Sequence, residues 1–281
     1  MRKYLSKILF IFLAVCMTGC ISIPEDVTLP PQTTEQSDTQ PPATNETTEP
    51  TTTEVPETSE PETTATEEIT ETDPPHSELY IEGLSVDDVI LYFNEVSLDA
   101  EFSDGGDATL LQKWDIPIYY VIIGNATDED LKVLTGFADW LNTIEGFPGI
   151  YEANEDQNPN LQIFFCTENE LIDHLGKNFY GVDGGVTFWY MDNMIYREII
   201  CYRTDLNQQL RNSVILEEIY NGLGPVQDSD LREDSLIYSG YSEPQSLTAI
   251  DELILKLLYH PDMKCGMNAA ACEEVIRRLY Y

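Results

Sequence analysis

The hydrophobic positions between residues 114 and 279 alternate between strand-like runs and helix-like stripes. Nearly continuous, β-rich apolar runs at 116–123 and 161–166 predict buried central strands. Two further runs, at 186–190 and 195–202, flank Asp192 and Asn193, a pair typical of a tight turn. These two runs therefore predict a β-hairpin.

Helix signals surround these strands, and several begin at a clear capping residue. Ser85, Thr127 and Asn207 each precede apolar positions at helical spacing. Thr248 is followed three residues later by Asp251, which forms a capping box. The predicted helices cover 85–96, 127–140, 169–175, 207–223, 248–260 and 268–279.

The order of these elements indicates the fold class. Strands and helices alternate first, and helices alone follow. This order favours an α+β domain with α/β-like character, in which a mixed sheet carries helices on one face and continues into a helical C-terminal part.

The first 20 residues have the pattern of a secretory signal. Arg2, Lys3 and Lys7 precede an apolar run that is too short to span a bilayer as a mature helix. The segment ends in Met17-Thr18-Gly19-Cys20, which resembles a bacterial lipobox. That resemblance implies that Cys20 is lipidated and anchors the protein to the extracytoplasmic face of the cell membrane.

Residues 21–75 form a Thr-, Glu- and Pro-rich segment without a basic residue. Its low apolar content predicts a disordered, extended tether. Residues 76–281 then have the length of one domain. The whole chain has a net charge of −37, so we expect no binding to nucleic acid.

Four cysteines follow Cys20, and in a secreted protein they are candidates for disulfide bonds. Cys265 and Cys272 bracket a short loop, and Cys166 and Cys201 each end a strand-like run. The alternative is that all four are small buried hydrophobic side chains.

The segment 216–224, with the three residues after it, carries the most specific signal. It resembles the H-E-x-x-H-x-x-G-x-x-H helix of metzincin zinc peptidases with the metal ligands replaced. Glu218 and Gly224 stand at the Glu and Gly positions of the pattern. The three His positions are taken by Glu217, Asn221 and Gln227.

The resemblance extends to residue 267. Ser235 to Tyr238 stands where these peptidases have their Met turn, with Ile237 at the Met position. The chain looks more specifically like an uncharacterised family of bacterial lipoprotein-associated domains that carry E-E-x-x-Q-x-L-G at this helix. Asn221 replaces the usual Gln. The resemblance implies a zincin-like fold and supplies no reaction.

The substituted positions decide the expected chemistry. Zinc sites use His or Cys with few carboxylates, so Glu217, Asn221 and Gln227 predict no metal site and no cofactor. Glu218 remains the candidate catalytic residue for a metal-independent hydrolase. The adjacent carboxylates of Glu217 and Glu218 diverge on a helix and do not suit glycosidase chemistry.

We therefore expect a non-catalytic, peptidase-like domain that binds a peptide or protein, and the metal-independent hydrolase is the alternative. The expected binding residues are Glu217, Asn221, Gln227 and Tyr238. Their helix should face a cleft between the sheet and the helices of 246–281, with Asn221 hydrogen-bonded there. The competing interpretation is a solvated polar face. The run at 184–192 would be the sheet edge that pairs with a peptide.

Overall fold

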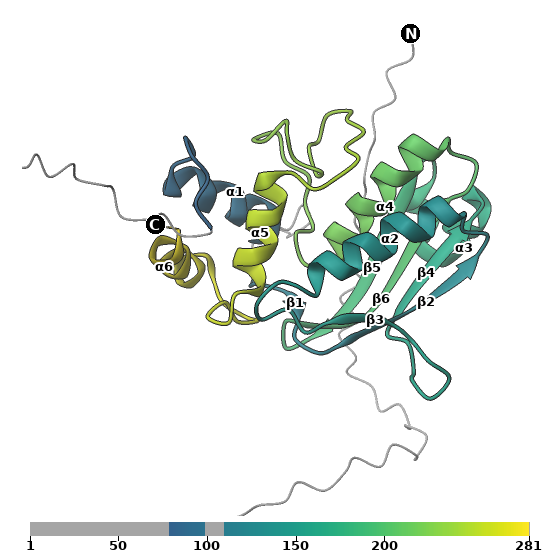
Figure 1. The fold of residues 1–281 in the computed structure, drawn as a ribbon, viewed down its shortest axis with the longest axis horizontal. Coiled ribbons are helices and arrows are strands. Elements are labelled where there is room, and N and C mark those ends of the chain that lie inside the picture. Colours follow the sequence, from purple (N-terminus) through teal and green to yellow (C-terminus); the bar gives the residue numbers. More distant parts are fainter. Residues whose placement is uncertain (1–78, 99–109, 281) are drawn as a thin grey trace, which may run out of the picture. The chain divides into compact units, whose positions relative to one another are not determined.

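A six-stranded sheet organises the part of the chain that the structure describes, residues 79–98 and 110–280 of a computed structural model (Figure 1). The strands are β1 Lys113–Trp114, β2 Ile118–Gly124, β3 Ile150–Glu152, β4 Leu161–Cys166, β5 Gly184–Met191 and β6 Met194–Arg203. Five of them are parallel in the order β1-β6-β4-β2-β3, and β5 runs antiparallel along β6. The fold is therefore α/β with a mostly parallel sheet.

The hairpin predicted from the sequence joins β5 to β6. Asp192 and Asn193 have φ angles of 52° and 63°, the left-handed conformation that a tight hairpin turn requires. The two short strands β1 and β3 were not predicted, because two or three residues are too few to show a period.

Six α-helices and one 3₁₀ turn accompany the sheet in the described residues. They are α1 Val86–Leu98, α2 Asp128–Leu141, α3 Glu168–Leu175, the 3₁₀ turn η1 Lys177–Phe179, α4 Gln208–Gly222, α5 Ala249–Tyr259 and α6 Ala269–Leu279. The predicted capping box of Thr248 with Asp251 is present, and Thr127, predicted as a helix start, forms a second capping box with Asp130. The cap positions thus locate the helix starts to within a residue or two.

The helices cover both faces of the sheet, so the prediction of helices on one face is wrong. Helices α2 and α4 lie side by side over one face, where they share the main core with Phe165 and Tyr202 (Figure 1). Helix α3 covers the opposite face, where its Leu171 packs with Cys166 and Cys201. The sequence did not reveal this second core, because the apolar runs of β4 and β6 do not distinguish the two faces of the sheet.

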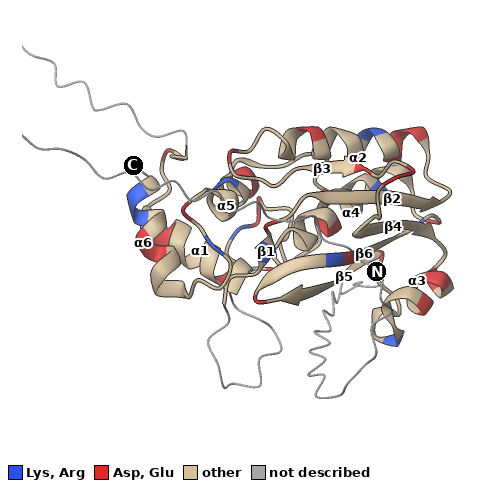
Figure 2. Cartoon of the chain, turned by 90° about the horizontal axis from the view of Figure 1, so that it is seen from below, with Lys and Arg blue, Asp and Glu red and all other residues tan. Residues whose placement is uncertain are grey.

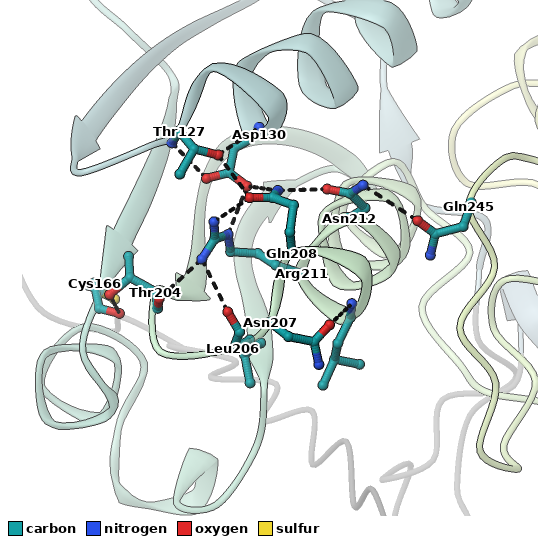
Figure 3. A network of polar contacts seen from close by, with 11 residues as sticks. Thr127, Asp130, Cys166, Thr204, Leu206, Asn207, Gln208, Arg211, Asn212 and Gln245 are labelled. Atoms are coloured by element: carbon teal, nitrogen blue, oxygen red, sulfur yellow. Dashed lines mark hydrogen bonds and ion pairs between the residues drawn. The ribbon is translucent and has the colours of Figure 1, made fainter.

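A buried ion pair fixes the start of α4 against the start of α2 (Figure 3). The Arg211 guanidinium donates to the Asp130 carboxylate at 2.7 Å, and it also donates to Gln208 and to the Thr204 carbonyl. Asp130 is completely buried, and its hydrogen bonds hold its pKa below the usual value against the effect of burial. The two helices are therefore joined at their N-terminal ends by charge as well as by packing.

A second buried network fixes the loop that follows α4. The Asp251 carboxylate accepts hydrogen bonds from the Ser235 hydroxyl at 2.6 Å and from the Leu236 backbone N–H. The Tyr92 hydroxyl of α1 donates to Ser235. The Asp251 carboxylate thereby connects α1, the loop and α5 by hydrogen bonds.

Residues 1–78 lie outside the described part of the structure, so the predicted signal, the lipidation of Cys20 and the tether are not represented in it. Within the described residues, every helix is too short or too polar to cross a membrane.

We expect Arg211→Met to lower the free energy of unfolding by about 3 kcal/mol, because it leaves the buried Asp130 carboxylate without its cation. Lys132→Met in α2 is the matched control. Its partner Glu129 is exposed, so the change should stay within about 0.5 kcal/mol. Urea unfolding of both variants measures the difference. Equal stabilities would contradict the role assigned to the ion pair.

Candidate functional site

A cleft opens between the N-terminal end of β5, helix α4 and the loop 228–242. Its volume is about 60 Å³, which is room for a few water molecules or the end of one side chain. The lining residues are Val182, Asp183, Gly184, Leu210, Ser213, Val214, Glu217, Glu218, Asp228, Leu236, Tyr238, Ser239, Gly240, Tyr241 and Ser242. None of them comes from the helices of 246–281, so the expected cleft against those helices is not the observed one.

One face of α4 forms a wall of this cleft. Leu210, Val214, Glu217 and Glu218 follow the spacing that places residues on one side of a helix. The remaining sides of α4 are also covered, since ten of its 15 residues are buried. The interpretation of a solvated polar face therefore does not hold for Glu218, which is 2% exposed, or for Asn221, which is completely buried.

Gly184 allows β5 to approach α4 closely. A β-carbon at this position would overlap the Val214 side chain and would lie 3.1 Å from Oε1 of Glu218. A glycine inside a strand often marks such a close approach. The pair Gly184-Gly185 at the start of a predicted strand is the sequence signal that could have located this wall of the cleft.

The carboxyl groups of the cleft have strongly altered acidities. Burial raises the pKa of Glu217 to about 8, and the charges of Asp228 and Asp183 add to the rise. Burial also raises the pKa of Glu218 well above its usual value, with further contributions from Glu217, Asp228 and Glu198. Glu217 therefore holds a proton at neutral pH, and the shift of Glu218 favours its protonated form as well.

Glu198 of β6 belongs to the same group of buried acids, and the sequence analysis missed it. Its side chain packs directly against Gly222 of α4, where a β-carbon would overlap its carboxyl. It is 2% exposed, and burial raises its pKa well above the usual value. A single acidic residue within the apolar run 195–202 was the available signal.

Asn221 and Gln227 lie outside the lining of the cleft. The Asn221 amide lies close enough to Glu218 to oppose the rise in its pKa, yet neither amide atom reaches hydrogen-bond geometry. The predicted hydrogen bond of Asn221 is therefore wrong. Gln227 is half-buried, and its side-chain oxygen also has no partner within the described structure. Only Glu217 and Tyr238 of the four expected binding residues line the cleft.

Tyrosines form the outer part of the cleft. Tyr238 is half-buried, whereas Tyr241 is 74% exposed at the rim. Ile237, at the position of the peptidase methionine, is completely buried in the same loop.

A zinc ion does not suit the residues at the three substituted positions. They offer one carboxyl and two amides, and the amides of Asn221 and Gln227 lie away from the cleft. Asn and Gln are poor ligands for zinc. Within the described residues, no three His, Cys, Asp or Glu side chains are grouped as metal ligands would be.

All four candidate disulfide cysteines are free thiols in this structure. Cys166 and Cys201 lie on the neighbouring strands β4 and β6 and pack together under α3. Cys272 is buried in α6, and Cys265 donates to the backbone carbonyl of Lys113. Cys166, Cys201 and Cys272 are thus buried as the alternative expected, whereas Cys265 is only half-buried, and the disulfide pairs stay a prediction.

The chain belongs to the family described as a protein of unknown function, DUF2927, whose model matches residues 87–278. This match covers the sheet, the cleft and all the helices but for the first residue of α1 and the last of α6. It confirms the expectation of an uncharacterised domain family. A comparison with curated proteins gave no match.

The raised pKa values of the buried carboxyls predict how stability depends on pH. A carboxyl whose pKa is higher in the folded than in the unfolded protein contributes stability that is fully present below its ordinary pKa and is lost as pH rises through the folded value. For Glu217 that window runs from 4.5 to about 8. The pKa values of Glu218 and Glu198 are also raised by burial, so these groups change the stability in the same direction. We therefore expect the free energy of unfolding to fall between these pH values.

Urea unfolding across this range measures the slope. Glu217→Gln, which mimics the protonated side chain, should flatten it, whereas Glu155→Gln in an exposed loop should leave it unchanged. A slope that is the same in all three proteins would show that Glu217 titrates alike in the folded and unfolded chain.

Proposed function

We propose that this protein is a lipid-anchored surface protein whose domain binds an extended peptide or protein segment without catalysis. The observation that carries the proposal is strand β5. Among the described strands it pairs only with β6, so no described strand pairs with its other edge, and its first residue, Gly184, lines the cleft (Figure 2 shows β5 at the edge of the sheet). Extended peptides add to such edges by main-chain hydrogen bonds.

The composition of β5 supports this use of its edge. Proteins usually protect an open edge with lysine, proline or other charged residues, because an unprotected edge pairs with other chains. Strand β5 reads Gly-Gly-Val-Thr-Phe-Trp-Tyr-Met and contains no charged residue and no proline. Its last two residues, Tyr190 and Met191, are 37% and 62% exposed. An open, apolar edge of this kind suits a partner strand.

The position of β5 also agrees with what the metzincin resemblance implies. In that fold an antiparallel edge strand lies next to the helix that carries the metal ligands, and it binds the substrate in extended form. Here β5 packs on α4 through Gly184, and α4 carries Glu217 and Glu218. We infer a zincin-like domain that has kept its peptide-binding edge and has lost its metal.

The alternative is a metal-independent hydrolase with Glu218 as general base. A general base must be ionised before it can take a proton. Burial and three neighbouring carboxyls raise the pKa of Glu218 well above its usual value, which favours the protonated form in the cleft. The raised pKa of Glu218 therefore favours a binding role over a role as general base.

Anchoring by Cys20 completes the proposal. The signal pattern before Cys20 and the polar tether after it would place the domain outside the membrane and at a distance from it. We expect Cys20→Ser to move the protein from the membrane fraction to the medium or to stop signal processing. Unchanged membrane association, with no lipid label on the wild type, would contradict the anchor.

A test of peptide binding starts from a displayed library of random peptides selected on the purified protein. We expect bound peptides to slow hydrogen exchange of the β5 amides, because they would accept or donate main-chain hydrogen bonds there. Tyr190→Lys places a charge on the edge strand and should weaken binding by about tenfold or more.

Tyr151→Lys is the matched control, because Tyr151 is 51% exposed on β3, at the opposite edge of the sheet. It should bind selected peptides like the wild type. A library that gives no binder, or binders that protect amides outside β5, would count against the proposed function.

A further inference from the structure

We propose that the cleft beside β5 recognises an alkylammonium group, such as the end of a lysine side chain, with Glu217 as its counter-charge. The inference rests on the proposed function in one respect: the lysine would belong to the peptide that pairs with β5. It adds a preference for one kind of side chain, which the edge strand alone does not provide.

The charge of the cleft is the first reason. Asp183, Glu217, Glu218 and Asp228 line it, and none of the described lining residues is Lys or Arg. The guanidinium of Arg203 contacts Asp183 at 3.5 Å, but its closer partner is Asp205 at 2.8 Å. The carboxyls of Glu217 and Glu218 therefore have no Lys or Arg beside them among the described lining residues.

The second reason is an unsatisfied group at the wall. Oε2 of Glu218 has no hydrogen-bond partner within the described structure, although the residue is only 2% exposed. A buried polar atom without a partner is costly, and the cost falls when a donor reaches it. An ammonium group brings three N–H donors and can contact Glu217 and Glu218 together.

The walls of the cleft suit the rest of a lysine side chain. Leu210, Val214 and Leu236 provide apolar surface for its methylene stem, which lysine usually buries along such surface. Tyr238 and Tyr241 lie toward the mouth, where aromatic rings attract a cation. The volume of about 60 Å³ admits the compact ammonium end of a chain and not a folded domain.

Binding of this cation has a consequence for pH. The titratable groups that face Glu217 are Glu218 on α4, Asp183 before β5, and Asp228, Tyr238 and Tyr241 in the loop. Because Glu217 holds a proton at neutral pH, an ammonium group favours its ionised form and displaces that proton. Affinity should therefore rise by up to about tenfold per pH unit below pH 8, where one proton leaves for each cation bound.

The experiment titrates the full chain with n-butylammonium chloride, the cation of a lysine side chain, and follows binding by calorimetry at several pH values. We expect saturable binding that strengthens with pH and that falls by about tenfold or more in Glu217→Gln. Gln resembles the protonated Glu of the folded protein, so this variant keeps the fold. Neutral n-butanol should not bind.

Glu155→Gln, in an exposed loop, should bind butylammonium like the wild type. The inference is overturned if butylammonium fails to bind, if Glu217→Gln binds it equally well, or if calcium chloride displaces it from the wild type. The last result would mean that the acids hold a divalent cation.

A pair of peptides separates this inference from the proposed function. One selected peptide carries lysine at the position that reaches the cleft, and its twin carries norleucine, which keeps the stem and removes the charge. Equal protection of β5 by both peptides would leave the proposed function standing and overturn the lysine preference. Butylammonium binding without any peptide protection of β5 would support recognition of the alkylammonium group and overturn the proposed function.

Discussion

Burial of helix α4 is the constraint on which the rest of the structure depends. The helix passes through the domain with ten of its 15 residues buried, and it carries carboxyl and amide groups into that interior. The Arg211–Asp130 ion pair fixes its first turn. Its last turn packs through Gly222 against Glu198 of β6. Each end of the helix therefore contacts a buried acid, and the two acids differ in their partners. Asp130 has a cation, and Glu198 has none in the residues around it.

This arrangement is the physical basis of our proposal that the cleft binds a ligand without catalysis. The cost of holding Glu217 and Glu218 in a poorly hydrated wall is reduced by keeping them protonated. A protonated carboxyl cannot take a proton from water. In the proposed function, an arriving cation displaces the proton of Glu217, and the peptide that carries the cation pairs with the edge of β5.

Much of the fold could be predicted from local patterns. The Thr127 and Thr248 capping boxes, the Asp192–Asn193 turn and the long apolar strands all depend on near neighbours in the chain. The position of α3 on the second face could not be read, because β4 is apolar on both sides. The site was partly predicted: Glu217 and Tyr238 line the cleft, whereas the burial of Asn221 and the contact of Glu198 with Gly222 depend on packing between distant segments.

The most direct test of the account is a carbon-13 titration of the side-chain carboxyls of Glu217 and Glu218, assigned with the Gln variant of each. The account predicts a midpoint of about 8 for Glu217 and a midpoint well above the ordinary value for Glu218. Midpoints near the ordinary value of 4.5 for both groups would show that the cleft leaves them ionised, and they would contradict the account.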